Sequence, residues 1–546
     1  MPDAAPRRPA RALPGLHRAP VMWRLPLGVL AGTQAIWLFW WAAFHPGLIS
    51  YDSVMYTWQV TTGNWTSDHS VLYDALVWVT LHLPGRFALL TLLQTTAMSA
   101  ALAYACVAMR DLGVRARWSV PAALAVAALP PTGTVVVFVW KDVPFYICAV
   151  LVFAATARLV AGRKRPRLSG RRGLRPGSVR FDLAVLTVGL LGLGLFRNNG
   201  LGLALLASAA LVIALPGQRI KLGSLTAATV LIPLVAQLWL YPALGVKQPP
   251  SDSVFALNYS DVAVAYQQAP SLFSPADIAV LERVAPLSTW QQGANCHSAD
   301  LLTNSWAPFD HAAAERYSGQ LMGLWTKVLK QRPDVIVGAR ICRGHIAWAP
   351  TSDRGAAGAT TQLPYLGTPA DLWGWASPAS TGDPKAGRIS PNGKMAGSPY
   401  LPDFATHPLS TTAHKAALWL NNLFRVPQLD WLFWRGATWC YLIYAALACY
   451  AIGRRRPAVY ALAGLLVGQQ LTVLAANPVE SYRYVAAPLF IGPFCLGLIA
   501  ARRESSGTAP VPAPENRSDL HREHPDRNGN RAAGTAATRA PQSVRL

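Results

Sequence analysis

The sequence predicts an all-α, polytopic membrane protein with about ten transmembrane helices. Of its 546 residues, 52% are hydrophobic and only 14% are charged, whereas a soluble chain of this size carries roughly a quarter charged residues. The apolar residues also gather in runs of about 17 to 25, the length that crosses the hydrocarbon core of a bilayer as a helix. About ten such runs lie near 27–44, 86–108, 118–139, 143–161, 181–197, 200–215, 222–242, 431–452, 458–476 and 485–501.

The first run, 27–44, follows a basic segment, 1–26, that contains five arginines. The run is too long for a signal peptide and is not followed by a small-residue cleavage site. We therefore interpret it as a retained first span and expect residues 1–26 to be cytoplasmic.

The connections between the runs divide by charge. With a cytoplasmic N-terminus, every connection on the inner side is basic, while the short outer connections hold very few cations. The inner ones read "RDLGVRARW", "GRKRPRLSGRRGLRPGSVR", "PGQRIK" and "GRRRP", followed by the tail from "ARRE". This is the positive-inside pattern, and it predicts that both termini face the cytoplasm. The high content of Ala, Arg, Pro and Trp is typical of a GC-rich bacterial genome, so we expect the membrane to be a bacterial cytoplasmic (inner) membrane. The formal charge of +23 is thus spread between apolar runs, so nucleic-acid binding is not predicted.

The long outer segment, 243–430, is polar and rich in Pro, Gly, Ser and Trp. It contains helix-like stretches and becomes loop-like from Thr351 to Pro402, so we expect an extracytoplasmic domain that is part helical and part irregular. Cys296 and Cys342 are its two cysteines, in a compartment that permits disulfides. A disulfide between them and a pair of free thiols both remain open.

Two further regions complete the chain. The membrane core 27–242, with its first outer loop 45–85, is joined after the outer domain by the C-terminal transmembrane helices in 431–501. The tail 502–546 is low in apolar residues and rich in Pro, Gly and charge, which is typical of a disordered segment.

Polar and charged side chains gather at the predicted outer ends of the spans, where a charge is costly unless it is paired or faces water. They occur in "SYDSVMYTWQVTTGNWTSDHSVLY", "FVWKDVPFY", "LFRNNG" and "NPVESYRY". Although distant in sequence, all four stretches meet the same membrane face. The candidate site residues in them are Asp52, Asp68, His69, Lys141, Asp142, Arg197, Asn198, Arg483 and Tyr484.

Simpler interpretations exist for single members of this set. An arginine or lysine at a helix end can extend to lipid phosphates, "RNNG" can be a tight turn, and Asp52–Ser53 can cap a helix. As a set, the residues favour a ligand with phosphate and sugar parts. Cations neutralise phosphate, aromatic rings stack on sugars, and a carboxylate can take a proton from a hydroxyl.

The acidic residue just after the first span, the helical "YTWQ" stretch and the later "H…LY" element together resemble the GT-C superfamily of integral membrane glycosyltransferases. The "KD" corner, "FRNNG" and "SYRY" resemble a bacterial branch of that superfamily. The resemblance covers the membrane core, roughly 27–242 and 431–501, and implies a GT-C-like fold. It also implies an inverting hexosyl or pentosyl transferase. The sugar donor would be a polyprenyl-phosphate-linked sugar, a lipid that lies in the membrane. The acceptor would be a cell-envelope glycan, lipid or protein.

In such families an acidic residue of the first outer loop is the general base, and here it matches Asp52. His69 would line the cleft or orient Asp52, and Asp68 is a second carboxylate for the base role. Lys141, Arg197 and Arg483 would stabilise the leaving phosphate. No metal constellation is seen, and a divalent cation bridging carboxylate and phosphate is not supported, so no cofactor is predicted.

Two other classes of function remain open. A secondary transporter or lipid or polysaccharide flippase would show internal repeats and helices broken at the bilayer midplane, for which "FRNNG" is the one candidate break. A non-enzymatic envelope scaffold would leave the charged set at the outer face without a purpose.

Overall fold

The computed structural model describes residues 21–162, 176–303, 308–352 and 398–501. These all belong to one compact unit, Met1–Arg503. Within this described part the regular elements are helices, and the only β-pairings are three isolated bridges. The prediction of an all-α chain is therefore confirmed there. The predicted disordered tail 502–546, most of the basic segment 1–26 and most of the loop-like stretch Thr351–Pro402 lie outside the described residues.

All ten predicted apolar runs are helical, and among the described residues seven helices are long and apolar enough to cross a membrane. Residues 216–243 form one of the seven from η1 (Pro216–Gln218), α10 (Arg219–Val235), the π-helical turn η2 (Ala236–Leu240) and α11 (Tyr241–Ala243). The other six are α1 (Val21–Ala43), α4 (Arg86–Asp111), α7 (Asp142–Gly162), α8 (Pro176–Phe196), α25 (Gly436–Arg454) and η7 (Pro457–Leu462) continued by α26 (Ala463–Ala476). A multi-pass membrane protein is thus supported by length and composition.

The remaining three runs differ from simple spans. The third is broken into α5 (Ala116–Ala128) and α6 (Pro130–Val136), which meet at 67°. Leu129 precedes Pro130 and has extended backbone angles, as the residue before a proline prefers. Two more, α9 (Gly200–Ala214) and α27 (Ala487–Ile499), span only about 20 Å at 1.5 Å per residue, less than the roughly 30 Å hydrocarbon core. The number of about ten spans therefore stays a prediction.

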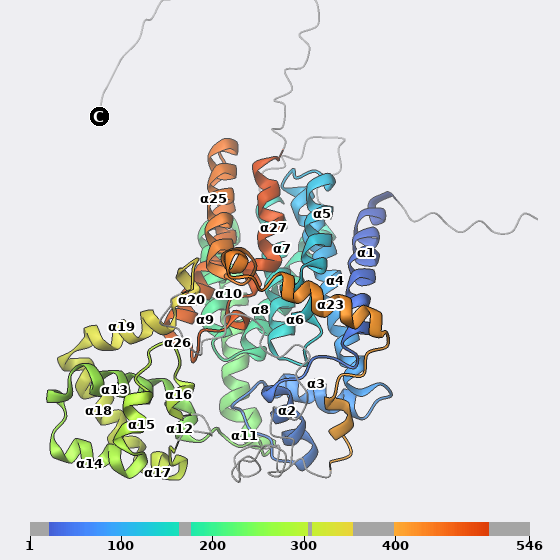
Figure 1. Ribbon diagram of the computed structural model, residues 1–546. Helices are drawn as coiled ribbons and strands as arrows, with labels where there is room; N and C mark the ends of the chain where they lie inside the picture. The colour runs from blue at the N-terminus through green and yellow to red at the C-terminus, as the bar shows by residue number, and fades with distance from the viewer. Residues whose placement is uncertain (1–20, 163–175, 304–307, 353–397, 502–546) are drawn as a thin grey trace, which may run out of the picture. The chain divides into compact units, whose positions relative to one another are not determined.

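The helices run roughly side by side, with two distinct ends (Figure 1). α1 begins and α27 finishes at one end. The other carries α2 (Tyr51–Thr62) and α3 (Val71–Leu81), and we call it the outer end. The outer domain lies towards this end as well. The start of α1 and the end of α27 thus lie at the same end of the bundle, and their orientation across a membrane stays a prediction.

A buried ionic cluster lies far from α2, where α4 ends and α8 begins. Arg158 of α7 places Nη1 2.8 Å from Asp111 Oδ2 and Nε 2.7 Å from Asp182 Oδ1. Tyr104 donates a hydrogen bond to Asp182 at 2.7 Å. Since burying an unpaired charge is costly, this cluster ties α4, α7 and α8 together.

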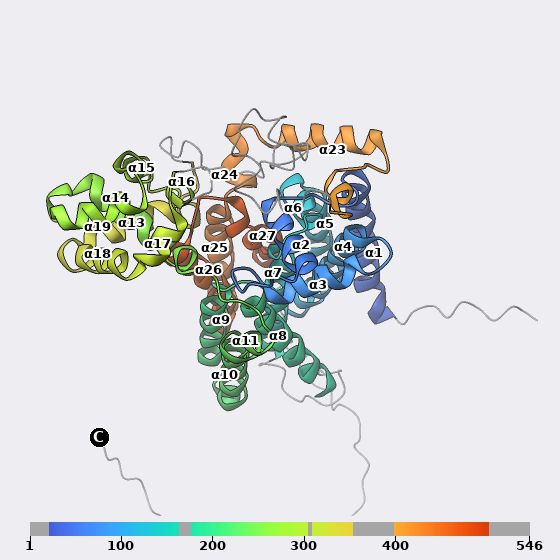
Figure 2. The same ribbon diagram turned by 90° about the horizontal axis from the view of Figure 1, so that it is seen from below.

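The outer domain occupies residues 251–348 and has a hydrophobic core of its own, which includes Val262, Trp290 and Leu321. In Figure 2 its helices lie beside α25 and α26 and away from α1. Its elements are α12 (Ser251–Val254), α13 (Ala256–Gln268), α14 (Pro275–Val284), α15 (Leu287–Gln292), α16 (Asp300–Thr303), α17 (His311–Arg316), α18 (Ser318–Gln331), α19 (Pro333–Arg343) and α20 (His345–Trp348).

The C-terminal part of the predicted outer segment packs elsewhere. α23 (Thr411–Leu423) contacts α1 and α6 and lies across the bundle in Figure 1. Leu409 donates its backbone N–H to Ala42 O at 2.9 Å, and a ring nitrogen of His414 lies 2.8 Å from Ala43 O. Residues 409–423 of the predicted outer segment 243–430 therefore pack against the membrane helices.

Cys296 and Cys342 form a disulfide, with Cα atoms 5.7 Å apart and a separation of 46 positions in sequence. A cross-link over a loop of this length removes chain entropy from the unfolded state and contributes about 2–4 kcal/mol. We expect the double variant Cys296→Ser/Cys342→Ser to lower the free energy of unfolding of the outer domain by that amount. Denaturant unfolding, followed with and without a reductant, measures it. Reductant should shift the wild type to the variant's midpoint and leave the variant unchanged.

Candidate functional site at the outer end

Backbone pairing brings the first outer loop onto the corner before α7. Leu48 donates its N–H to Val137 O and accepts from Val139 N, both at 2.9 Å. Ser53 Oγ donates to Val139 O at 2.7 Å. Because Trp140, Lys141 and Asp142 follow directly, the start of α2 is held beside them.

α2 is capped by Ser50. Its backbone N–H donates to Ser53 Oγ at 3.0 Å, and the two hydroxyls lie 3.3 Å apart. Of the two residues in the alternative Asp52–Ser53 cap, Ser53 takes part as the third residue of the capping box, whereas Asp52 lies inside the first turn and does not cap the helix. The carboxylate of Asp52 takes no part in the cap.

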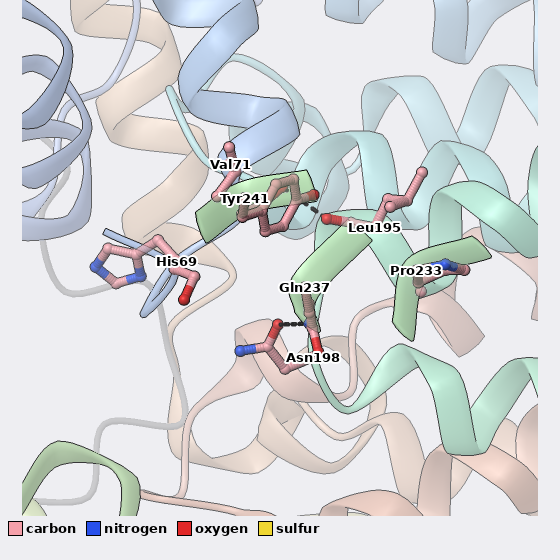
Figure 3. A pocket seen from close by; sticks show the side chains of 10 residues that line it. His69, Val71, Leu195, Asn198, Pro233, Gln237 and Tyr241 are labelled. Carbon is pink, nitrogen blue, oxygen red and sulfur yellow. Dashed lines mark hydrogen bonds between the residues drawn. The ribbon is translucent and has the colours of Figure 1, made fainter. Parts of the chain in front are cut away.

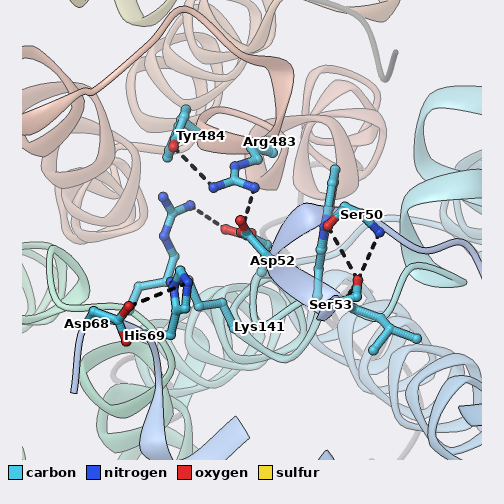
Figure 4. A network of polar contacts seen from close by, with 12 residues as sticks. Ser50, Asp52, Ser53, Asp68, His69, Lys141, Arg483 and Tyr484 are labelled. Carbon is cyan, nitrogen blue, oxygen red and sulfur yellow. Dashed lines mark hydrogen bonds and ion pairs between the residues drawn. The ribbon is translucent and has the colours of Figure 1, made fainter. Parts of the chain in front are cut away.

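Arg483 meets that carboxylate from the far end of the chain. It lies in the short η8 turn (Tyr482–Tyr484) between α26 and α27. Its Nη1 donates to Asp52 Oδ2 at 2.8 Å, and its Nη2 donates to the Tyr484 hydroxyl at 3.2 Å (Figure 4). The guanidinium also lies over the Trp140 ring, 5.4 Å from its centroid. One ion pair therefore joins residues 431 positions apart in sequence.

Arg197 lies in the turn between α8 and α9 and pairs with Asp142 at the start of α7, with 2.7 Å between Nη1 and Oδ1. The Asp142 side chain is completely buried and that of Arg197 is 7% exposed. Arg197 also lies over Tyr484, at 4.7 Å from the ring centroid, so Tyr484 contacts both guanidinium groups. The turn requires Gly200, because a Cβ there would lie 1.8 Å from Leu193 O.

Lys141 and His69 form the third part of the site. Lys141 Nζ donates to His69 Nδ1 at 2.6 Å (Figure 4). The neighbouring Asp68 is engaged within its own loop, where its Oδ1 accepts from Thr66, from Gln59 Nε2 at 3.0 Å and from the His69 backbone N–H at 2.8 Å. Asp68 is thus less available than Asp52 as a proton acceptor.

Burial and charge set the protonation of these groups. Burial alone would raise the pKa of Asp52, but the charges of Arg483 and Lys141, and that of His69 when it is protonated, outweigh it and hold that pKa below its ordinary value. Burial, followed by the charge of Lys141, lowers the pKa of His69. Burial lowers the pKa of Lys141 against the pull of Asp52 and Asp142. At neutral pH we therefore expect an ionised Asp52 beside a neutral His69.

A small pocket lined by uncharged side chains adjoins this charged network. His69 belongs to both, because it contacts Lys141 and also lines the pocket (Figure 3). Asn198 is not part of the ionic network. It accepts from Gln237 Nε2 at 3.2 Å on the pocket wall. The lining residues are Ser67, His69, Ser70, Val71, Gly194, Leu195, Asn198, Pro233, Gln237 and Tyr241.

The outer domain reaches the site through a backbone contact, which we call the junction (residues 297–300 and 478–480). Ser298 and Val479 form an antiparallel bridge, and Ala299 donates its N–H to Pro478 O at 2.8 Å. Buried Glu480 lies 2.9 Å from a ring nitrogen of His345 and 3.5 Å from one of His297. The junction places Asp300 next to the loop that carries Arg483.

Cys296, His297 and Cys342 have potential ligand atoms within 4.8 Å of one another. The two sulfurs are bonded to each other, and a metal ligand must be a thiolate. We therefore draw no metal site from this group.

Comparison of the chain with protein-family models, with curated proteins and with solved structures gives no match. The resemblance to GT-C glycosyltransferases thus rests on the residues alone.

The structure brings all the predicted ionic residues and Tyr484 to one end of the bundle. Sequence reasoning missed the roles of Trp140 and Asp300. Trp140 directly precedes Lys141 in "FVWKDVPFY", one of the stretches that predict the site, so its place there was predictable. Apart from its closeness to Cys296, nothing in the sequence indicates that Asp300 lies near the site. Its place follows from the junction, which depends on tertiary packing.

Proposed function

We propose that the protein is a membrane glycosyltransferase that moves a sugar from a polyprenyl-phosphate carrier to a hydroxyl acceptor of the cell envelope, at the outer face of the cytoplasmic membrane. The observation that carries the proposal is the grouping of Lys141, Arg197 and Arg483 with the ionised Asp52 at one end of an apolar bundle. These cations come from three separate connections.

The ligand class follows from charge and position. Several cations at the edge of an apolar helix bundle suit an anionic group that is attached to a lipid. Arginine binds phosphate oxygens through a planar set of N–H donors. The adjoining pocket, with serine, asparagine, glutamine and tyrosine side chains, offers hydrogen bonds without charge, as sugar hydroxyls require.

The proposed reaction is a displacement with inversion. An acceptor oxygen attacks the anomeric carbon, the bond from that carbon to the phosphate oxygen breaks, and the phosphate leaves with the electron pair. Its developing charge is stabilised by the cations. Asp52 takes the proton of the attacking hydroxyl as general base, and His69 orients the groups around it through Lys141.

The cations are already paired with protein carboxylates, which bears on how a phosphate binds. Arg483 uses one terminal nitrogen for Asp52 and the other for the Tyr484 hydroxyl. A donor phosphate would therefore compete with these partners. Displacing Arg483 from Asp52 would also make Asp52 a stronger base, because that charge lowers its pKa.

The decisive experiment uses the purified protein reconstituted in vesicles with radiolabelled undecaprenyl-phosphate-linked hexoses and pentoses and a crude envelope fraction as acceptor. Asp52→Asn should lower transfer by about 100-fold or more, the scale of a lost general base. Asp334→Asn, at an exposed carboxylate of α19, should transfer as the wild type does. Equal transfer by Asp52→Asn and wild type would remove Asp52 from this role. Movement of lipid or solute across the bilayer without transfer from any donor would favour a transporter.

A further inference from the structure

We propose that the outer domain supplies the acceptor side of the site, with the Asp300 carboxylate accepting a hydrogen bond from a hydroxyl of a sugar-like acceptor. This inference rests on the proposed function and adds a residue to it. The donor side, by contrast, consists of the cations Lys141, Arg197 and Arg483, and Asp52 would lie between the donor and the attacking hydroxyl.

The position of Asp300 is fixed by the junction. Ser298 and Ala299 pair with the backbone of Pro478 and Val479, four and five residues before Arg483. The contact of His297 with Glu480 joins the same two segments through side chains, and His345 of α20 contacts Glu480 as well. The disulfide of Cys296 anchors the segment within its own domain. Asp300 thus starts α16 at a defined place beside the Arg483 loop.

The groups that face Asp300 come from several elements. The charges of Arg483, Asp52 and Arg343 act on its carboxyl group, and that carboxyl in turn acts on Tyr484. Of the helices packed against α16, α13 contributes the buried Asp261, which is already paired with Arg343 at 3.0 Å. Asp300 is therefore in electrostatic reach of the reacting groups.

Within the described part of the chain, no hydrogen bond or ion pair engages the Asp300 side chain, in contrast to Asp52, Asp68 and Asp142. A carboxylate next to a phosphate site would repel the donor phosphate. It would instead bind a neutral, hydroxyl-bearing molecule through charge-assisted hydrogen bonds. An acceptor that approaches from the aqueous side would meet the outer domain first. These three points assign Asp300 to the acceptor.

The protonation of Asp300 provides a specific readout. Burial, opposed by Arg483 and reinforced by Asp52, raises the pKa of Asp300 to about 6. Its carboxylate form, which is the better acceptor of a hydroxyl proton, is present above that pH and is lost as the pH falls through it. We therefore expect the acceptor KM of the wild type to rise as the pH is lowered from 7.5 to 5.

The test measures two reactions of the full-length protein in vesicles with an undecaprenyl-phosphate-linked sugar. One is hydrolysis of the donor without acceptor, and the other is transfer to a panel of octyl glycosides used as acceptor probes. Asp300→Asn should raise the acceptor KM about 10-fold to 100-fold, the loss expected for a hydrogen bond to a charged group. It should not lower donor hydrolysis, because Asp300 is assigned to the acceptor and not to the leaving phosphate, and it should abolish the pH dependence of KM. Asp300→Glu should restore part of the affinity.

Asp52→Asn is the contrasting variant, because it should lower hydrolysis and transfer together. Asp334→Asn is the matched control within the outer domain. The inference is overturned if Asp300→Asn behaves as Asp334→Asn, or if it lowers hydrolysis and transfer in equal measure. A wild type that turns over none of the donors would instead overturn the proposed function, and with it this inference. Thermal unfolding of each variant excludes a folding defect as the cause.

Discussion

Replacing Arg483 with methionine should lower kcat/KM for sugar transfer by about 1,000-fold, the upper range for loss of one charge-stabilising group in a transition state. Methionine keeps much of the length of the side chain but removes the charge. The variant loses a cation at the leaving phosphate and leaves Asp52 without the partner that now lies 2.8 Å away. Steady-state kinetics with the labelled donor measure the fall.

The pH profile adds a second expectation for this variant. The charge of Arg483 helps to hold the pKa of Asp52 below its ordinary value, so removing it should raise that pKa. Whatever activity remains should then decline at a higher pH than in the wild type as the pH falls. Arg483→Lys, which keeps the charge but not the planar donor set, should recover part of the rate. A methionine variant with unchanged kcat/KM would contradict the role of Arg483 as a phosphate ligand.

The second large effect concerns stability. Asp142→Ala should lower the free energy of unfolding by about 3–5 kcal/mol, because it leaves Arg197 buried without its carboxylate. The pair is enclosed, with Asp142 fully buried and Arg197 only 7% exposed. Unfolding in mixed detergent micelles with increasing denaturant measures the change.

A double variant separates charge from packing at the same position. Asp142→Leu/Arg197→Met replaces both charges with apolar side chains and should be far more stable than Asp142→Ala, since neither charge is left unpaired. It should nevertheless transfer sugar poorly, because Arg197 is a proposed phosphate ligand. Breaking the exposed Arg332–Asp334 pair with Asp334→Ala should cause no measurable loss of stability. Equal losses from Asp142→Ala and Asp334→Ala would contradict the buried-pair argument.

The sequence predicted the helical bundle well, because membrane insertion selects for long apolar runs whose limits are visible in composition. All ten runs are helices. The break at Leu129–Pro130 was not predicted, although the two prolines were visible. Pro130 disfavours helix at the preceding residue, whereas prolines inside α1, α10 and α27 are accommodated. The shortness of α9 and α27 depends on how the chain turns before each of them.

The site was predictable in its membrane part and not in its outer part. Arg197 and Arg483 stood out because charges at the ends of apolar runs are rare and expensive. In a polar domain such as 243–430, a carboxylate like Asp300 is ordinary and gives no such signal. Likewise, the sequence did not reveal that Asp68 is engaged by Gln59 and Thr66, since those bonds depend on the turn after α2. The pairing partners of the charges were set by tertiary structure.

The ion pair between Asp52 and Arg483 has a consequence for the order in which the protein becomes active. Asp52 follows the first helix to enter the membrane, whereas Arg483 precedes the last one, α27. A ribosome must therefore have delivered almost every span before the two charges meet. The junction adds a further condition, because residues 478–480 contact residues 297–299 of the outer domain, which must also have folded. A chain that lacks its last helix thus lacks the Asp52–Arg483 pair, and its candidate site is incomplete.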